Sequence, residues 1–203
     1  MAEKTVKRRG RAGPTKASKR RATPKGLSLG ESVLAAWATT DRTTTFLVER
    51  MPAGLWDAPV PGAHRKTVRM IAAHLHNARC GWIRTLGGPH GIEAPERVDR
   101  HHVNRRELVR ALKASGRAMT SLLAFGLTQD GRIPPTPKYV WRNLPLDVGH
   151  VLSYFVAHEG HHRGQIVMLG RLLGHPLPRE VTDGLWWWTG RSAEAVARGR
   201  RNV

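Results

Sequence analysis

Apolar residues recur every three or four positions in four separate stretches of the chain, which is the period of an amphipathic helix. These stretches are residues 29–50, 67–82, 104–125 and 148–173. The segments between them are rich in glycine and proline, as connecting loops are. The pattern predicts an all-α fold, an up-and-down four-helix bundle in which the apolar faces form the core.

Capping residues and prolines mark the ends of the predicted helices. Ser28 and Glu31 have the spacing of a capping box, and so do Asn104 and Glu107, so helices should begin just after the first residue of each pair. A proline ends the first helix near Arg50, and another precedes the fourth helix. The connecting segments are predicted as loops: residues 51–62, 87–103 and 127–145.

Two histidines interrupt the apolar stripe of the last predicted helix. His158 and His162 are four residues apart, so a helix places them about 40° apart on one face. A single histidine on an apolar face is more often a hydrogen-bonded core residue, but two of them need two buried partners. The spacing therefore favours a pair of metal ligands that point into the bundle.

A third candidate ligand lies on the second predicted helix. His74 is at the edge of the apolar stripe of that helix, whereas His76 and Cys80 project to the other side. We therefore expect His74 to complete a three-histidine site with His158 and His162. Two alternatives stay open: His74 is a partly exposed polar residue, or His76 and Cys80 form a competing site.

Three protein ligands leave coordination positions open to water or substrate, which is typical of a catalytic metal site. Imidazole suits zinc, nickel and iron, so the expected cofactor is a divalent transition metal of one of these kinds. Glu159 and His161 flank the histidine pair and are weaker catalytic candidates. Glu159 could accept a hydrogen bond from a metal-ligating histidine, act as a base, or form an exposed ion pair on the bundle surface. His161 could assist proton transfer or be a surface histidine.

The charge of the chain is concentrated toward its ends. The formal net charge is +19 over 203 residues, and ten of the lysines and arginines lie in residues 1–26, against Glu3 alone. This segment has almost no apolar side chains, so we expect a disordered basic tail that either contacts nucleic acid through phosphates or has no dedicated partner. Residues 191–203 are expected as a second basic tail, which leaves residues 27–190 as the bundle.

The chain shows no sign of export or of membrane insertion. Cys80 is the only cysteine, so no intrachain disulfide is possible. No stretch approaches the length of a membrane span, and no secretory signal is present. We expect a cytoplasmic protein without membrane contacts. An organellar transit peptide is the alternative for the arginine-rich start, although that segment lacks an amphipathic face.

Three consecutive tryptophans, Trp186, Trp187 and Trp188, follow the last predicted helix. They cannot all face one way on a regular element. We expect them to form a lid that packs against the bundle or across a subunit interface, where each ring is buried and its N–H is bonded. The alternative is that one of them contacts substrate.

The residues around the histidines resemble a known family. The run AHEGHHRGQI at 157–166, preceded by AAHLHNARCGWI at 72–83 and by Trp-Asp-Ala-Pro at 56–59, is similar to the DinB/YfiT-like family of bacterial metal-binding four-helix proteins. The similarity covers most of residues 27–188 and excludes both tails. It implies that the metal ligands are the residues already singled out: His74, His158 and His162.

The resemblance also implies a range of functions. Members are similar to S-transferases and isomerases that use a low-molecular-weight thiol, or to metal-dependent hydrolases, and they often form homodimers. We therefore expect an enzyme that activates a thiol or water on the metal and acts on a small molecule. The alternative is a non-enzymatic, metal-containing protein that binds nucleic acid through residues 1–26, a basic extension that departs from the compact family pattern.

Overall fold

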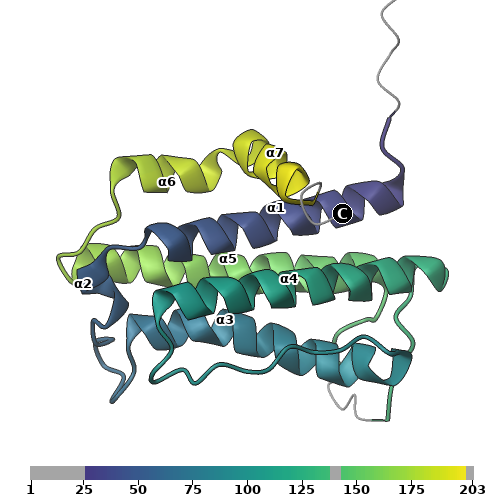
Figure 1. Cartoon of the computed structure of the whole chain (residues 1–203), viewed down its shortest axis with the longest axis horizontal. Coiled ribbons are helices and arrows are strands. Elements are labelled where there is room, and N and C mark those ends of the chain that lie inside the picture. Colours follow the sequence, from purple (N-terminus) through teal and green to yellow (C-terminus); the bar gives the residue numbers. More distant parts are fainter. Residues whose placement is uncertain (1–25, 138–142, 200–203) are drawn as a thin grey trace, which may run out of the picture.

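Four long helices lie side by side and form the body of the protein (Figure 1). The computed structural model describes residues 26–137 and 143–199. Within them α1 packs against α4 and α5, and α3 packs against the same two helices. No strand occurs in these residues, which confirms the predicted all-α class. The long helices are α1 (Leu29–Arg50), α3 (Val68–Trp82), α4 (Arg105–Thr128) and α5 (Val148–Leu172).

Both predicted capping boxes are present. The Ser28 hydroxyl accepts a hydrogen bond from the Glu31 amide at 3.2 Å, and the Glu31 carboxylate accepts one from the Ser28 amide at 2.6 Å. Asn104 starts α4 in the same reciprocal way. The α5 helix begins at Val148, as predicted, and its N-terminal cap is Asp147, whose carboxylate accepts a hydrogen bond from the backbone amide of His150 at 3.0 Å.

Two connecting segments contain more helix than expected. The segment predicted as a loop at 51–62 contains the short helix α2 (Ala53–Trp56), which buries Leu55 and Trp56 against the core. The α3 helix continues through the π-helical turn η1 (Ile83–Gly87) and the 3₁₀ turn η2 (Gly88–His90). Burial of apolar side chains accounts for the extra helix at α2, where the local sequence is rich in proline and glycine.

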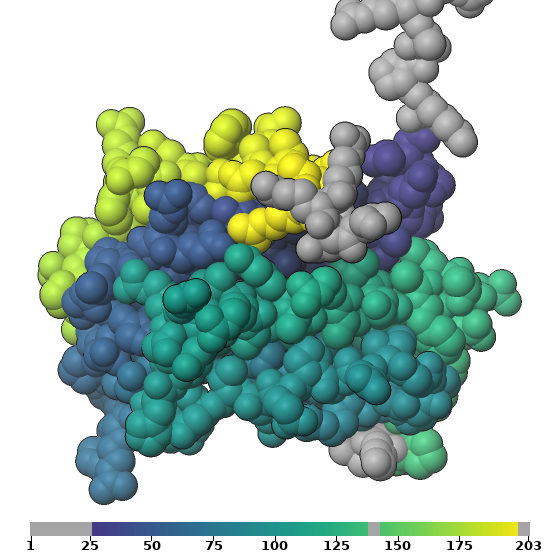
Figure 2. Space-filling view, in the orientation of Figure 1, coloured from purple at the N-terminus to yellow at the C-terminus, as the bar shows by residue number. Residues whose placement is uncertain are grey.

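The C-terminal part of the chain folds back onto α1. Two helices, α6 (Arg179–Trp186) and α7 (Trp188–Gly199), contact α1 and form a ridge above it (Figures 1 and 2). Residues 191–199, expected as part of a basic tail, are therefore helical. Ion pairs stabilise α7 against α1: Glu194 pairs with Arg42 of α1 at 2.5 Å and with Arg191 of its own helix at 2.8 Å.

The three tryptophans do not bury their rings against the bundle as expected, and their packing across a subunit interface stays a prediction. Trp186, Trp187 and Trp188 are 80%, 60% and 41% exposed. The packed side of this segment is occupied instead by Val181 and by the buried Arg191, whose guanidinium lies 4.0 Å from the centroid of the Phe46 ring. The segment covers α1 as a lid would, but with other side chains.

A polar layer divides the apolar core of the bundle. One cluster contains Leu47, Leu75 and Leu112, and the other contains Trp37, Met119 and Phe155, together with their neighbours. On each long helix the buried residues between the clusters are polar or small. They include Thr44 of α1, Arg79 of α3, Ser115 of α4 and Glu159 of α5.

Two of the expectations from the sequence concern contacts with nucleic acid and with membranes. The proposed nucleic-acid contact lies in residues 1–26, of which all but Gly26 fall outside the described residues. Among the described helices, none is both long and apolar enough to cross a membrane.

Candidate metal centre

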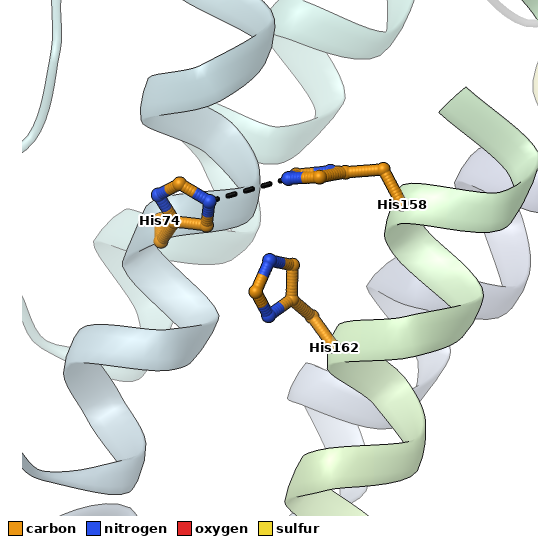
Figure 3. Close-up of side chains that lie close together, drawn as sticks. All are labelled: His74, His158 and His162. Carbon is orange, nitrogen blue, oxygen red and sulfur yellow. Dashed lines mark hydrogen bonds between the residues drawn. The ribbon is translucent and has the colours of Figure 1, made fainter. Parts of the chain in front are cut away.

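Three histidines from two helices meet at the edge of the bundle between α3 and α5 (Figure 3). His74 is on α3, and His158 and His162 are one turn apart on α5. The Nε2 atoms of His74 and His158 are 3.2 Å apart. Each of the three residues offers a ring nitrogen within 4.8 Å of the others. The structure thus brings together the three histidines that the sequence analysis singled out as candidate ligands.

Gln165 fixes the orientation of His162. Its Oε1 atom lies 2.8 Å from Nδ1 of His162, which must carry a proton to donate this hydrogen bond. The Nε2 atom of His162 then keeps its lone pair, and that end of the ring points toward the space between His74 and His158 (Figure 3). Histidines that bind a metal through one ring nitrogen usually donate a hydrogen bond from the other ring nitrogen to a nearby acceptor.

The environment keeps the three imidazoles neutral near pH 7. Burial, followed by the neighbouring His162 and His74, lowers the pKa of His158 to about 4. The pKa values of His74 and His162 are also below the ordinary value, chiefly because of burial. A neutral imidazole carries the lone pair that a metal needs, so these residues can act as ligands without first losing a proton.

The donor set suits a divalent transition metal. Two nitrogens bound to one tetrahedral ion at about 2.0–2.1 Å lie roughly 3.3 Å apart. The nitrogens of His74 and His158, at 3.2 Å, are close to that separation. Three imidazoles fill three positions, which leaves room for a further ligand. The three histidines could therefore hold a metal ion.

The histidines lie nearer to the surface than expected. The spacing of apolar residues predicts that His158 and His162 lie in the middle of the apolar stripe and point into the core. In the structure the buried row of α5 runs through Val151, Phe155 and Glu159, and the two histidines lie beside it, half-buried. The prediction was wrong on this point because the stripe was located from apolar residues alone, and its centre includes a glutamate.

Glu159 belongs to a buried polar network. Its Oε1 atom accepts a hydrogen bond from Nε of Arg79 at 2.6 Å, and its Oε2 atom accepts one from the Thr44 hydroxyl at 2.5 Å. Nη1 of Arg79 donates to Asp41 at 2.6 Å. The Arg79 guanidinium also lies over Trp37, 4.9 Å from the ring centroid. Arg79 and Glu159 are fully buried, so the alternative of an exposed ion pair for Glu159 is wrong.

The network links all four long helices. Arg79 of α3 contacts Glu159 of α5, Asp41 of α1 and the carbonyl of Leu112 on α4. Burial lowers the pKa of Arg79, but the two facing carboxylates outweigh burial and raise the pKa above its ordinary value. Arg79 therefore remains charged. Both oxygens of Glu159 are occupied, which leaves it unsuited to act as a base.

A family model matches most of this chain. The model of the DinB family covers residues 24–192. The chain belongs to the DinB family. Comparison with curated proteins and with solved structures found no match. The matched region includes the four long helices and the three histidines at the edge of the bundle.

The competing site on α3 of this DinB-family protein is otherwise engaged. His76 is fully buried against α4, not turned away from the core as expected. Its Nδ1 atom lies 3.0 Å from the Ser115 hydroxyl, and its Nε2 atom lies 2.9 Å from the backbone carbonyl of Glu96. Both ring nitrogens therefore have partners in the protein. The Cys80 thiol is buried beside this ring, and burial raises its pKa.

Two clefts adjoin the histidines of the DinB-family protein. The larger, of about 700 Å³, includes His74 and His162 in its lining. The smaller, of about 440 Å³, is lined in part by His161. His161 is exposed, and its Nε2 atom accepts a hydrogen bond from the Gln165 amide at 3.0 Å. Clefts of these sizes are suited to small molecules.

The buried network was missed in the sequence, although a signal for it exists. Arg79 follows Leu75 by four residues, and Glu159 follows Phe155 by four residues, so each charge continues a buried row of its helix. Opposite charges at core positions of two helices of one bundle indicate a buried pair, because an unpaired charge there is costly.

Proposed function

We propose that this protein is a metal-dependent enzyme that activates a thiol or water at His74, His158 and His162. The observation that carries the proposal is the convergence of three neutral imidazoles, from two helices, at an open edge of the bundle. A closed structural site would use four protein ligands, whereas three leave a position for a reactant.

A divalent ion such as zinc, nickel or iron would act there as a Lewis acid and lower the pKa of a coordinated water or thiol toward neutrality. The protein's own residues supply the rest. Gln165 holds His162 in the tautomer that presents Nε2. Tyr154 stacks on His158, with ring centroids 5.7 Å apart. His161 lines the smaller cleft, and a role for it in proton transfer stays a prediction, because Nε2 of its ring already accepts a hydrogen bond from Gln165.

The family and the site are compatible with a thiol-dependent S-transferase and with a hydrolase. We favour a small-molecule substrate for either reaction because the clefts beside the histidines are of metabolite size. The homodimer that the resemblance implies stays a prediction, which the mass in solution tests.

The first test is elemental analysis of untagged protein after mild dialysis. We expect about one equivalent of a transition metal in the wild type and a loss of nearly all of it in His158→Ala. His150→Ala is the matched control, because His150 is an exposed histidine on the same helix and pairs with Asp147. A wild-type protein that stays metal-free when zinc, nickel and iron are offered would refute the proposal, as would a variant that keeps its full metal content.

A further inference from the structure

The larger cleft beside the histidines carries an excess of positive charge. Its lining includes Lys66, Arg97 and Arg100 and contains no aspartate or glutamate. No ion pair with a carboxylate is formed by any of these three cations among the described residues. What sets these three cations apart from other cations of this basic chain is their position, because all three line one cleft together with His74 and His162.

The wall that carries two of these cations is held firmly against α3. The side chain of Asn77 makes two hydrogen bonds with the backbone of Val98, both at 3.0 Å. The buried His76 ring bonds the carbonyl of Glu96 at 2.9 Å. Arg97 lies between these two anchor points in the sequence, and Arg100 follows shortly after. The loop is therefore positioned by buried or half-buried polar groups of α3, and its arginines are presented to the cleft at little further cost in ordering.

The cations share their cleft with two of the candidate ligand histidines. Lys66 and Arg100 line the same cleft as His74. The cleft includes His74 and His162 in its lining. A molecule in the cleft would thus be in reach of both the cations and the ligand histidines.

We infer that this cleft binds the anionic group, a carboxylate or a phosphate, of the small substrate that reacts at the histidines, with Lys66, Arg97 and Arg100 as its charge partners. The identification of the bound anion as part of a substrate rests on the proposed function, but anion binding itself can be tested without metal. Guanidinium groups recognise both oxyanions through paired hydrogen bonds, so the two are probed separately.

The experiment is isothermal titration of the full chain, metal-free and metal-loaded, with succinate, inorganic phosphate and the uncharged analogue succinamide at near-physiological ionic strength. We expect at least one of the two anions to bind and succinamide not to bind. Arg97→Gln/Arg100→Gln should weaken anion binding by about tenfold or more in the metal-free protein, since charged hydrogen bonds are lost. Lys66→Gln should weaken it less, because an ammonium acts as a single point charge.

The matched control is Arg110→Gln/Arg117→Gln, which removes the same charge from exposed positions of α4 outside the cleft. We expect it to leave binding unchanged. Equal weakening by the control would overturn the inference in favour of general charge attraction, and so would wild-type protein that binds neither anion. Metal content, measured on the same samples, separates the two proposals. Anion binding without metal uptake would refute the proposed metal enzyme but support the anion site in the cleft. Metal uptake without anion binding would refute the anion site alone.

Discussion

Helices α3 and α5 carry two polar clusters that differ in almost every physical respect. Arg79 and Glu159 are fully buried and paired with each other. His74 of α3 and His158 and His162 of α5 are exposed or half-buried. In the first cluster the carboxylate and most of the guanidinium donors have protein partners. In the second, ring nitrogens converge on one another, and no carboxylate of residues 26–137 or 143–199 forms an ion pair with them.

The difference separates a polar group that stabilises the fold from one that is available for chemistry. Removing one partner of a buried ion pair leaves an uncompensated charge in the core, so the Arg79 and Glu159 pair must stay intact. A half-exposed imidazole can be removed at little cost to folding. Its ring is therefore available to serve as a metal ligand. The following predictions test this division, from the largest expected effect to the smallest.

Glu159→Ala should lower the free energy of unfolding by about 3–5 kcal/mol, because Arg79 is left in the core with Asp41 as its remaining carboxylate partner. Chemical denaturation monitored by circular dichroism measures the loss. His158→Ala, at the neighbouring position, is the comparison and should cost far less in metal-free protein. Similar losses for the two variants would remove the distinction between the clusters.

Metal should stabilise the wild type through the histidines alone. Zinc or nickel at about 100 times its dissociation constant raises the free energy of unfolding by about 2.7 kcal/mol when only the native state binds it. We expect this increase in wild type and in His150→Ala and its absence in His158→Ala. Thermal unfolding with and without metal gives the answer, and stabilisation of His158→Ala by metal would place the site elsewhere.

Two adjacent threonines on α1 test the buried network directly. The Thr44 hydroxyl donates to Glu159 and accepts from Arg163 at 2.8 Å, whereas the buried Thr45 hydroxyl has no hydrogen-bond partner among the described residues. Thr44→Val should therefore cost about 1–3 kcal/mol of unfolding free energy, and Thr45→Val should be neutral or stabilising. Chemical denaturation of both variants measures the two changes in unfolding free energy. Equal losses in the two variants would contradict a role for Thr44 in the buried network.

Gln165→Ala should weaken metal binding by about 10- to 100-fold without unfolding the protein, because His162 loses the acceptor that fixes its tautomer. Competition with a chromogenic chelator measures the affinity. Gln165→Glu keeps an acceptor oxygen and should retain most of the affinity. If Gln165→Ala binds metal as tightly as wild type, the side chain has no part in orienting the ligand.

Acid should destabilise the metal-free protein through the histidine cluster. The pKa of His158 is about 4 in the folded chain against an ordinary 6.5, so below pH 6.5 the unfolded chain takes up a proton that the folded chain does not. Stability should therefore fall as the pH drops from about 6.5 toward 4 and should be unaffected by this residue above that window. Denaturation at several pH values should show that the free energy of unfolding declines less steeply with acid in His158→Ala than in the wild type. Identical slopes would contradict the low pKa of His158 in the folded chain.

Much of the helical framework was predictable because its signals are local. The caps at Ser28 and Asn104 involve residues three positions apart, so the sequence shows both partners together. The spacing of His158 and His162 is likewise local. The helix α2 and the helical course of residues 191–199 were not predicted, because each is stabilised by burial or ion pairs with residues distant in the chain.

The sequence by itself therefore determined which segments are helical and which histidines could meet, since periodicity and one-turn spacing follow from the geometry of a single helix. Only the tertiary structure decided how each helix is rotated. That rotation places Glu159 in the core and His158 at the edge, although the two are adjacent in the chain. The physical reason is pairing: Arg79 and Asp41, from two other helices, make the burial of a glutamate tolerable, and that contact is absent from the local pattern.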